Sequence, residues 1–375
     1  MKTAHLAAMA EPPLMMKPTL PVPLSPTLME RLSIRLSPLA GKSRVISRKR
    51  ASTRKGVKGR ASRCANFTLS GLALTLLLVP TLAAANCTSA FCTINTDWNA
   101  QTPWLNNATS LDLRVETIHQ NQVRSGVNKS VYTGHDREVE TINRNGWFGL
   151  SHAFTRDLNV SVQVPLVSRD HLHIQLHDGV LLPERWDFTR LGDVRVLAHV
   201  RLDDKPSSVD GMYGMMAGIK LPTGSTDERN RDGVKAEPTL QPGTGSTDLI
   251  AGGFVSGRLT RVDWHMQLRW QHAVSVRQQY RPGDQVGLDA GIRYPLGPVH
   301  ALAQINLLWR DRDTGMNAES DDSGGKFIYF SPGVALPLGK DMQVYGLVQL
   351  PLYQYVQGTQ LTADWAATLG LSMRF

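Results

Sequence analysis

Apolar and polar residues alternate along the final segment of the chain, and this alternation constrains the fold more than any other feature. Leu361, Trp365, Leu369, Leu371 and Phe375 fall on one face of an extended strand, whereas most residues between them are polar. Only a β-strand places every second side chain on the same side, so a period of two predicts a strand. The same period recurs through most of the chain after residue 110.

The connections between the predicted strands decide which β fold forms. Strands are predicted near residues 110–119, 137–155, 158–176, 191–203, 210–222, 246–259, 262–273, 285–296, 299–311, 325–338, 342–356 and 361–375. Short turns are predicted at 156–157, 203–210, 260–261, 297–298 and 339–341. Long polar loops are predicted at 121–136, 177–190, 223–245, 274–284 and 312–324. Short and long connections that alternate along an even number of strands are typical of outer-membrane barrels. We therefore predict an all-β, transmembrane, antiparallel up-and-down β-barrel of about twelve strands over residues 110–375, in the outer membrane of a Gram-negative bacterium.

Charge is divided unevenly along the chain. The sequence has 41 Lys and Arg against 32 Asp and Glu, a formal charge of +9. Before position 87 lie 14 of the basic and two of the acidic residues, which leaves 27 basic and 30 acidic residues beyond it. The basic excess therefore belongs to the N-terminal region and does not indicate a nucleic-acid partner.

The N-terminal region has the order of an export signal. A basic stretch leads into the apolar run 72–79, which is followed by Pro80 and the small residues 83–85. The run is shorter than the roughly 20 residues that a membrane helix needs. We predict a signal peptide over 66–85, with cleavage before Asn86. The basic, Pro-rich extension 1–65 is expected to be disordered; it reflects either a start assigned upstream of the true one or an extended export signal. Residues 86–109 are expected to form a short periplasmic segment or a plug.

Two cysteines, Cys87 and Cys92, remain after the predicted cleavage. The periplasm is oxidising, so we predict a disulfide between them. Two thiols with no nearby histidine favour this over a metal site, and no metal or cofactor is expected.

Five short motifs carry a resemblance to a known family. They are Gly218–Gly224, Leu240–Leu249, Tyr280–Asp284, Ser331–Gly333 and Gln349–Gln354. In this order they resemble the outer-membrane proteins grouped as the MetA pathway of phenol degradation, which are labelled transporters, and the resemblance covers roughly residues 140–375. It implies a barrel, an outer-membrane location and a link to aromatic compounds. It implies no catalytic residues.

The polar face of the predicted strands describes the interior of the barrel. The candidate lumen-lining residues are Arg195, Arg201, His265, Arg269, Asp289, Arg293, Gln304, Arg310 and Asp364. Arginine predominates among them, which favours anionic or polar solutes if the path through the barrel is open. We therefore predict a porin-like channel or transporter for passive uptake of small solutes, aromatic or anionic in character.

Two other functions remain open. The charges could pair across the narrow interior and fill it, which would make a non-conducting structural or adhesin-like barrel. A lipid hydrolase is less favoured, because no serine and histidine fall together on the outer face of neighbouring strands. The protein is thus not expected to be an enzyme. Besides the solute, the expected partners are the outer-membrane bilayer and, through the C-terminal Phe375, the barrel-assembly machinery.

Overall fold

The structure is a computed structural model that describes residues 86–87, 107–131, 137–177, 180–203 and 211–375. These residues belong to the compact unit Leu77–Phe375. Among them, no helix is long and apolar enough to span a membrane. The predicted extension, the predicted signal peptide and Cys92 lie outside the described residues, so these assignments stay predictions.

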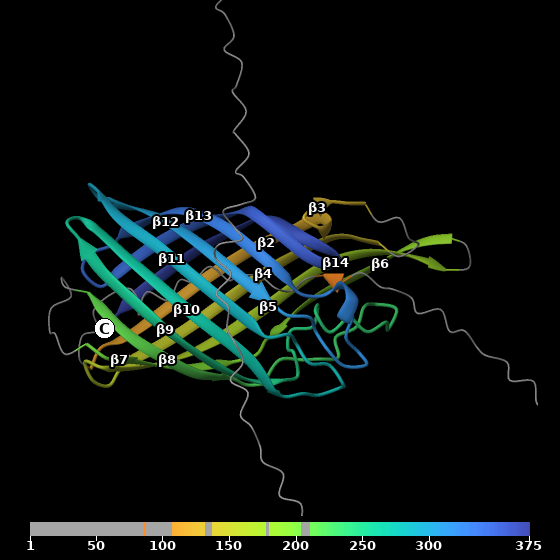
Figure 1. Cartoon of the computed structure of the whole chain (residues 1–375), viewed down its shortest axis with the longest axis horizontal. Coiled ribbons are helices and arrows are strands. Elements are labelled where there is room, and N and C mark those ends of the chain that lie inside the picture. The colour runs from red at the N-terminus through yellow and green to blue at the C-terminus, as the bar shows by residue number, and fades with distance from the viewer. Residues whose placement is uncertain (1–85, 88–106, 132–136, 178–179, 204–210) are drawn as a thin grey trace, which may run out of the picture. The chain divides into compact units, whose positions relative to one another are not determined.

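The long strands are antiparallel neighbours in one sheet, and Figure 1 shows them running obliquely around a closed wall. In chain order they are β2 (Thr109–Gly126), β4 (Arg137–Ala153), β5 (Leu158–His177), β6 (Val180–Leu191), β7 (Arg195–Arg201), β8 (Met212–Lys220), β9 (Thr247–Leu259), β10 (Val262–Ser275), β11 (Gln285–Leu296), β12 (Val299–Arg310), β13 (Gly325–Pro337) and β14 (Met342–Arg374). Two short strands, β1 (Asn86–Cys87) and β3 (Asn128–Lys129), pair with β14 and β2, and η4 (Ser320–Asp322) is one 3₁₀ turn.

Strand β14 crosses the wall twice and closes it. Its first half pairs with β13 and its second half pairs with β2, up to the partners Arg374 and Ser110. Gly358, with a φ of +71°, lies where the chain reverses between the two halves. Eleven described strands form the ring, and with β14 counted twice the wall has twelve passes. The predicted closed antiparallel barrel is confirmed.

Two predicted loops contain strand. Residues 177–190 were expected to form an outer loop, but residues 180–191 form β6, which pairs with β5 down to Leu166 and Leu191. The outward residues of β6 include the exposed Arg185 and Asp187, so this extension lacks the apolar face on which the prediction relied. Strand β2 likewise continues to Gly126, into the loop predicted at 121–136. Strands of this barrel therefore extend beyond its apolar belt.

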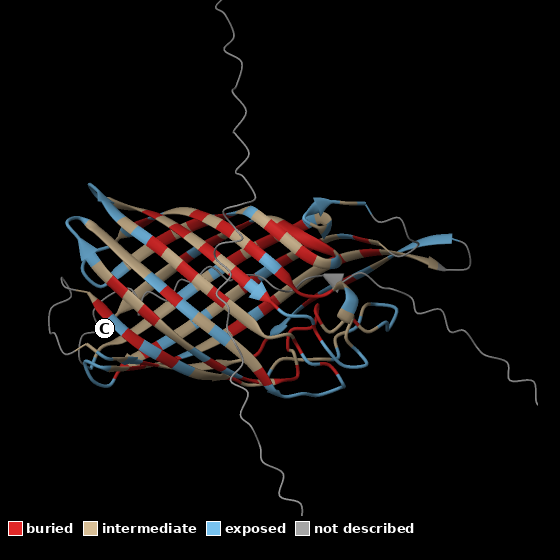
Figure 2. Ribbon diagram, viewed as in Figure 1, coloured by how far each residue is buried: buried red, intermediate tan, exposed pale blue. Residues whose placement is uncertain are grey.

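Side chains alternate between the outer surface of the barrel and its interior. On β10, Met266 and Leu268 are 43% and 50% exposed, whereas Gln267 between them is 5% exposed. Figure 2 shows this alternation as stripes of buried and exposed residues across the strands. A closed wall that is apolar outside and polar inside satisfies its backbone hydrogen bonds and suits a lipid environment. The barrel is accordingly an outer-membrane protein.

Aromatic residues face outward near both ends of the wall. Trp270, Trp309 and Trp365 are 38–53% exposed near the end that carries the long loops, and Tyr294 lies toward the end with short turns. Such amphipathic rings favour the two membrane interfaces. Phe375 exchanges backbone hydrogen bonds of 2.8 Å with Thr109 and so joins the last strand to the first. Its recognition by assembly machinery stays a prediction.

Candidate functional site

Buried polar side chains on β11 to β14 hydrogen-bond across the inner wall. The Nδ2 of Asn306 donates to Asp289 Oδ1 at 2.6 Å, and Ser331 Oγ donates to Asn306 Oδ1 at 2.8 Å. Gln349 Nε2 reaches the same Asn306 oxygen at 3.5 Å. Gln304, 5% exposed, lies opposite Ser331 on the neighbouring strand. Because buried polar groups need partners, this sector of the lumen wall is a hydrogen-bonded and ordered surface.

Trp147 lies between two guanidinium groups inside the barrel. Trp147 is one of the residues of β4 whose side chains face the interior. The Cζ atoms of Arg114 on β2 and Arg195 on β7 lie 4.9 Å and 5.4 Å from its ring centroid. A cation within about 6 Å of an aromatic face is attracted by the ring. Asp112 lies 3.8 Å from Arg114 and accepts a 2.8 Å hydrogen bond from Tyr345. Strands β2, β4 and β7 thus position one cationic surface.

Arg269 extends the cationic surface from β10. The residues directly opposite it on β9 and β11 are Gly252 and Gly287, so neither paired position carries a side chain beside Arg269. A Cβ at Gly287 would lie 3.8 Å from Arg269 Nη2. The positive charges of Arg269 and Arg195 repel each other. We call Arg114, Arg195 and Arg269 the lumen arginine cluster.

Two members of the lumen arginine cluster lack a local anion. Within the described residues, neither Arg195 nor Arg269 makes a side-chain hydrogen bond or an ion pair. Asp193 and Asp248 attract Arg195 from a distance. Both side chains are partly exposed, so their guanidiniums remain available to a passing anion.

Other predicted lumen arginines are held by local partners near the end with short turns. Arg201 Nε donates to Asp203 Oδ1 at 2.7 Å, and this hydrogen bond lowers the pKa of the Asp203 carboxyl. Arg293 Nε donates to His300 Nδ1 at 2.8 Å. His265 faces the lumen from β10, where its ring covers Gly291. The structure therefore places these residues inside the wall but separates them from the arginine cluster.

Arg310 belongs to a buried network at the loop-bearing end. Its Nη2 reaches both carboxylate oxygens of Asp313, at 2.6 Å and 2.8 Å. Tyr280 Oη donates to Asp313 at 3.0 Å, and Gly283 N donates to the same carboxylate at 2.8 Å. Burial raises the pKa of Tyr280, which keeps its hydroxyl protonated as a donor. The motif at 280–284 thus fastens one outer loop to the wall.

Asp364 does not line the lumen as predicted. It lies at irregularities in the pairing of β14 with β2 and bonds to His119 Nδ1 at 2.8 Å. His119 also bonds to Glu140 at 2.7 Å and stacks on the outward Trp365. Asp364 is itself the residue that the pairing skips between Ala363 and Trp365, and strict alternation does not describe the side chain of such a bulged residue.

A buried ion network fixes the loop between β8 and β9. Lys220 Nζ lies 3.2 Å from Asp193 and 3.0 Å from Asp248, and all three side chains are at most 7% exposed. Asp193 also accepts hydrogen bonds from the backbone N of Gly224 at 3.0 Å and of Thr244 at 2.9 Å. The two ends of loop 221–246 are therefore tied to one carboxylate. We call Asp193, Lys220 and Asp248 the loop anchor.

The loop anchor explains two of the sequence motifs. Lys220 and Gly224 belong to the first motif, and Asp248 belongs to the second. The two ends of the loop pass close to each other, since a Cβ on Gly224 would lie 2.7 Å from the Cα of Gly243. The motifs resembled a family without indicating that their charged residues pair, because that contact requires the strands to be neighbours in space.

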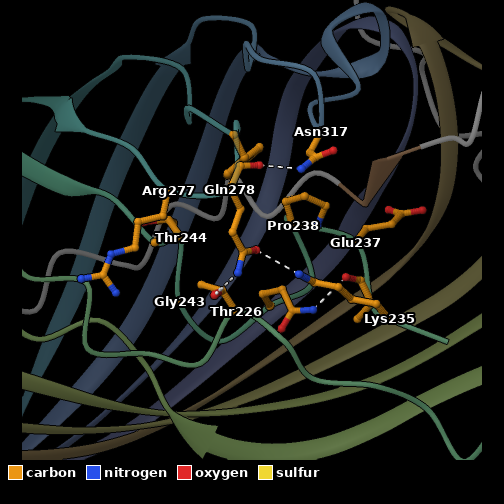
Figure 3. Close-up of a pocket in the computed structure, with 13 residues that line it drawn as sticks. Thr226, Lys235, Glu237, Pro238, Gly243, Thr244, Arg277, Gln278 and Asn317 are labelled. Atoms are coloured by element: carbon orange, nitrogen blue, oxygen red, sulfur yellow. Dashed lines mark hydrogen bonds between the residues drawn. The ribbon is translucent and has the colours of Figure 1, made fainter. Parts of the chain in front are cut away.

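Three outer loops enclose a pocket of about 320 Å³, shown in Figure 3. They are the loops that follow β8, β10 and β12, which contribute residues 226–245, 277–280 and 317. Gln278 links them: its Oε1 accepts from Lys235 Nζ at 2.9 Å, and its Nε2 donates to Thr226 at 3.1 Å. Asn317 Nδ2 donates to the backbone oxygen of Gln278 at 2.5 Å. We call this cavity the mouth pocket.

No group of three metal-ligating side chains stands together in the part of the chain that the structure describes. The predicted partner of Cys87 lies outside it, so the Cys87–Cys92 disulfide stays a prediction.

No protein-family model and no curated protein sequence matches the chain. Among solved structures, the chain is similar to the COG4313 outer membrane channel from Pseudomonas putida F1, with a TM-score of 0.54, 13% identity, and coverage of 73% of this chain and 98% of that one. Lower similarities link it to the toluene transporter TodX of P. putida (TM-score 0.39, 11% identity, 75% and 93% covered) and to the translocator domain of the autotransporter NalP from Neisseria meningitidis (0.37, 9%, 74% and 91%).

At these identities the comparisons show the fold alone, and the two lower TM-scores add no argument. The first similarity agrees with the closed outer-membrane barrel described above. The resemblance to the MetA-pathway group stays a prediction.

Proposed function

We propose that the protein is an outer-membrane channel for the passive passage of small solutes, with a preference for anions. One observation carries the proposal: Arg195 and Arg269 face the lumen and make no ion pair with a described residue. A protein that only filled its interior would gain by pairing these charges. A fold shared with an outer-membrane channel is consistent with this role.

The arrangement of the arginines suits transit rather than tight binding. Arginine stays charged at any physiological pH and can hold a carboxylate through two parallel hydrogen bonds. Trp147 restrains two of the guanidiniums by cation–π attraction, so they are ordered before an anion arrives. Because conduction requires a site weak enough to release its solute, partial compensation by Asp193 and Asp248 is favourable.

The single variant Arg195→Gln is expected to lower the anion preference of reconstituted channels while leaving them folded, since it removes one lumen charge. The measurement is the ratio of chloride to potassium permeability in a planar bilayer. Arg144→Gln is the matched control, because Arg144 is exposed on the outer surface of β4 and should leave the ratio unchanged. Equal ratios in wild type and Arg195→Gln would contradict the role given to this residue.

A non-conducting structural or adhesin-like barrel is the second candidate. The buried hydrogen-bonded ladder around Asn306, which is fully buried, favours it, because such contacts can close a lumen. Folded barrels that pass no ions in a bilayer would establish this candidate. His119 supports no hydrolytic role, because both of its ring nitrogens bond to carboxylates and neither is left for a nucleophile.

We further propose that the exported protein begins at Asn86, with Cys87 and Cys92 oxidised to each other. N-terminal sequencing of protein purified from outer membranes is expected to start at Asn86. Mass spectrometry after thiol blocking is expected to show neither cysteine labelled unless a reductant is added first. A start upstream of residue 66, or full labelling without reductant, would contradict these assignments.

A further inference from the structure

The mouth pocket combines cationic and apolar surfaces in one cavity. Lys235 and Arg277 supply positive charge, and Ala236, Pro238 and Tyr280 supply apolar surface. Glu237 lies on the opposite side of the pocket from Arg277 (Figure 3). A cavity of this size is at the lower end of the range for small-molecule sites.

Among the described residues that line the pocket, Arg277 is a cation without a side-chain partner. Its side chain makes no hydrogen bond or ion pair with any residue that the structure describes. Lys235, by contrast, is shared between Gln278 at 2.9 Å and the exposed Asp227 at 3.5 Å. Figure 3 shows Gln278 between these two cations, so a small anion at Arg277 would meet one guanidinium without a described partner, and Lys235 would add a positive charge from the far side of Gln278.

The backbone at the pocket is strained. Gln278 and Gln279 are adjacent residues that both have a φ of +54°, a backbone region that residues other than glycine rarely occupy. Such strain gathers at ligand clamps and switch regions. Here the hydrogen bonds from Lys235 and Asn317 hold Gln278 in place. The strained segment presents Arg277 at one end and the buried Tyr280 at the other.

Two parts of the pocket lining are tied to the barrel wall. Thr244 lines the pocket, and its backbone N donates to the buried Asp193 of the loop anchor. Tyr280 is fastened to Asp313 in turn. Thr244 and Tyr280 therefore connect the pocket lining directly to the barrel. The pocket is formed before a solute arrives, so binding requires little ordering of loops.

We propose that the mouth pocket is a capture site for small carboxylates with an apolar body, which it holds at the entrance before they reach the lumen arginine cluster. The carboxylate binds Arg277, Lys235 adds positive charge from the other side of Gln278, and the apolar body lies against Pro238, Ala236 and the edge of Tyr280. This proposal rests on the proposed channel function for its purpose, but the binding itself does not require conduction.

The test is equilibrium binding of benzoate to the full folded barrel in detergent, measured by calorimetry. Benzamide is the probe control, because it has the same ring and no charge. Arg277→Gln is expected to weaken benzoate binding about tenfold, since it removes one charge-assisted contact. Arg231→Gln is the matched control, because Arg231 is an exposed residue of the loop that follows β8 and does not line the pocket, and this variant should bind benzoate as the wild type does.

The outcomes separate this proposal from the channel function. Binding of benzoate over benzamide that weakens in Arg277→Gln supports the capture site, whether or not the barrel conducts. No benzoate binding to the wild type, or binding that is lost in Arg269→Gln but unchanged in Arg277→Gln, overturns the capture site and leaves the channel function standing. Absence of conductance with Arg277-dependent binding overturns the channel function alone.

Discussion

Lys220→Met is expected to lower the free energy of unfolding by about 3–5 kcal/mol, because it leaves two buried carboxylates without their cation. Asp193 and Asp248 are both at most 7% exposed, so water cannot replace the lost partner. Urea unfolding of the barrel in lipid vesicles, followed by tryptophan fluorescence, measures the change. A difference of less than about 0.5 kcal/mol, the range of ordinary surface changes, would contradict the anchor.

The same substitution should also loosen loop 221–246. The loop contains Arg229, Arg231 and Lys235, so trypsin is expected to cut it faster in Lys220→Met than in the wild type. Lys340→Met is the matched control, since Lys340 is exposed in a turn at the other end of the barrel. If Lys220→Met fails to fold, Asp193→Asn provides the milder test, because it keeps the lysine and one carboxylate. Unchanged cleavage in a folded variant would show that the loop is held by other contacts.

The double variant Arg195→Glu, Arg269→Glu is expected to invert the ion preference of the channel. It replaces two unpaired positive charges in the lumen with two negative ones, a difference of four charges in a narrow, weakly screened space. Lumen substitutions in such barrels tune selectivity more than stability, so the variant should still fold. The paired arginines provide a contrast: the double variant Arg201→Gln, Asp203→Asn should change the preference little, because it removes a pair that is neutral overall.

The wall of the barrel could be predicted from the sequence because lipid and lumen impose a period of two on every membrane-crossing strand. This is why the predicted strand 285–296 coincides with β11 and 262–273 with all but the last two residues of β10. The prediction failed where lipid no longer imposes the pattern. Strand β6 projects past the apolar belt with charged outward residues, so its sequence resembles a loop.

A bulge caused the other error. Strict alternation placed Leu361 on the same outer face as Trp365, but Leu361 is fully buried beside Trp186 and Leu240, whereas Trp365 is 38% exposed. The irregular pairing between Thr362 and Trp365 changes the side on which the residues fall. A single inserted residue leaves no signal in composition or periodicity that distinguishes it from regular strand.

The candidate site was only partly visible in the sequence. Alternation predicted that Arg195 and Arg269 face inward, but it could not tell them from Arg201 and Arg310, which have partners of their own. Trp147 follows the same alternation on β4, although its place between two arginines depends on the register of β2 and on β7. Partners across strands are set by that register and by loops, and neither is encoded in a local pattern.

The most direct measurement of the central claim is the reversal potential of single channels under a gradient of potassium chloride. The wild type is predicted to show discrete conductance with a potential of the sign set by chloride, and the Arg195→Glu, Arg269→Glu variant is predicted to show the opposite sign. A folded wild-type barrel that passes no current, or a potential that is the same in both proteins, would contradict the account.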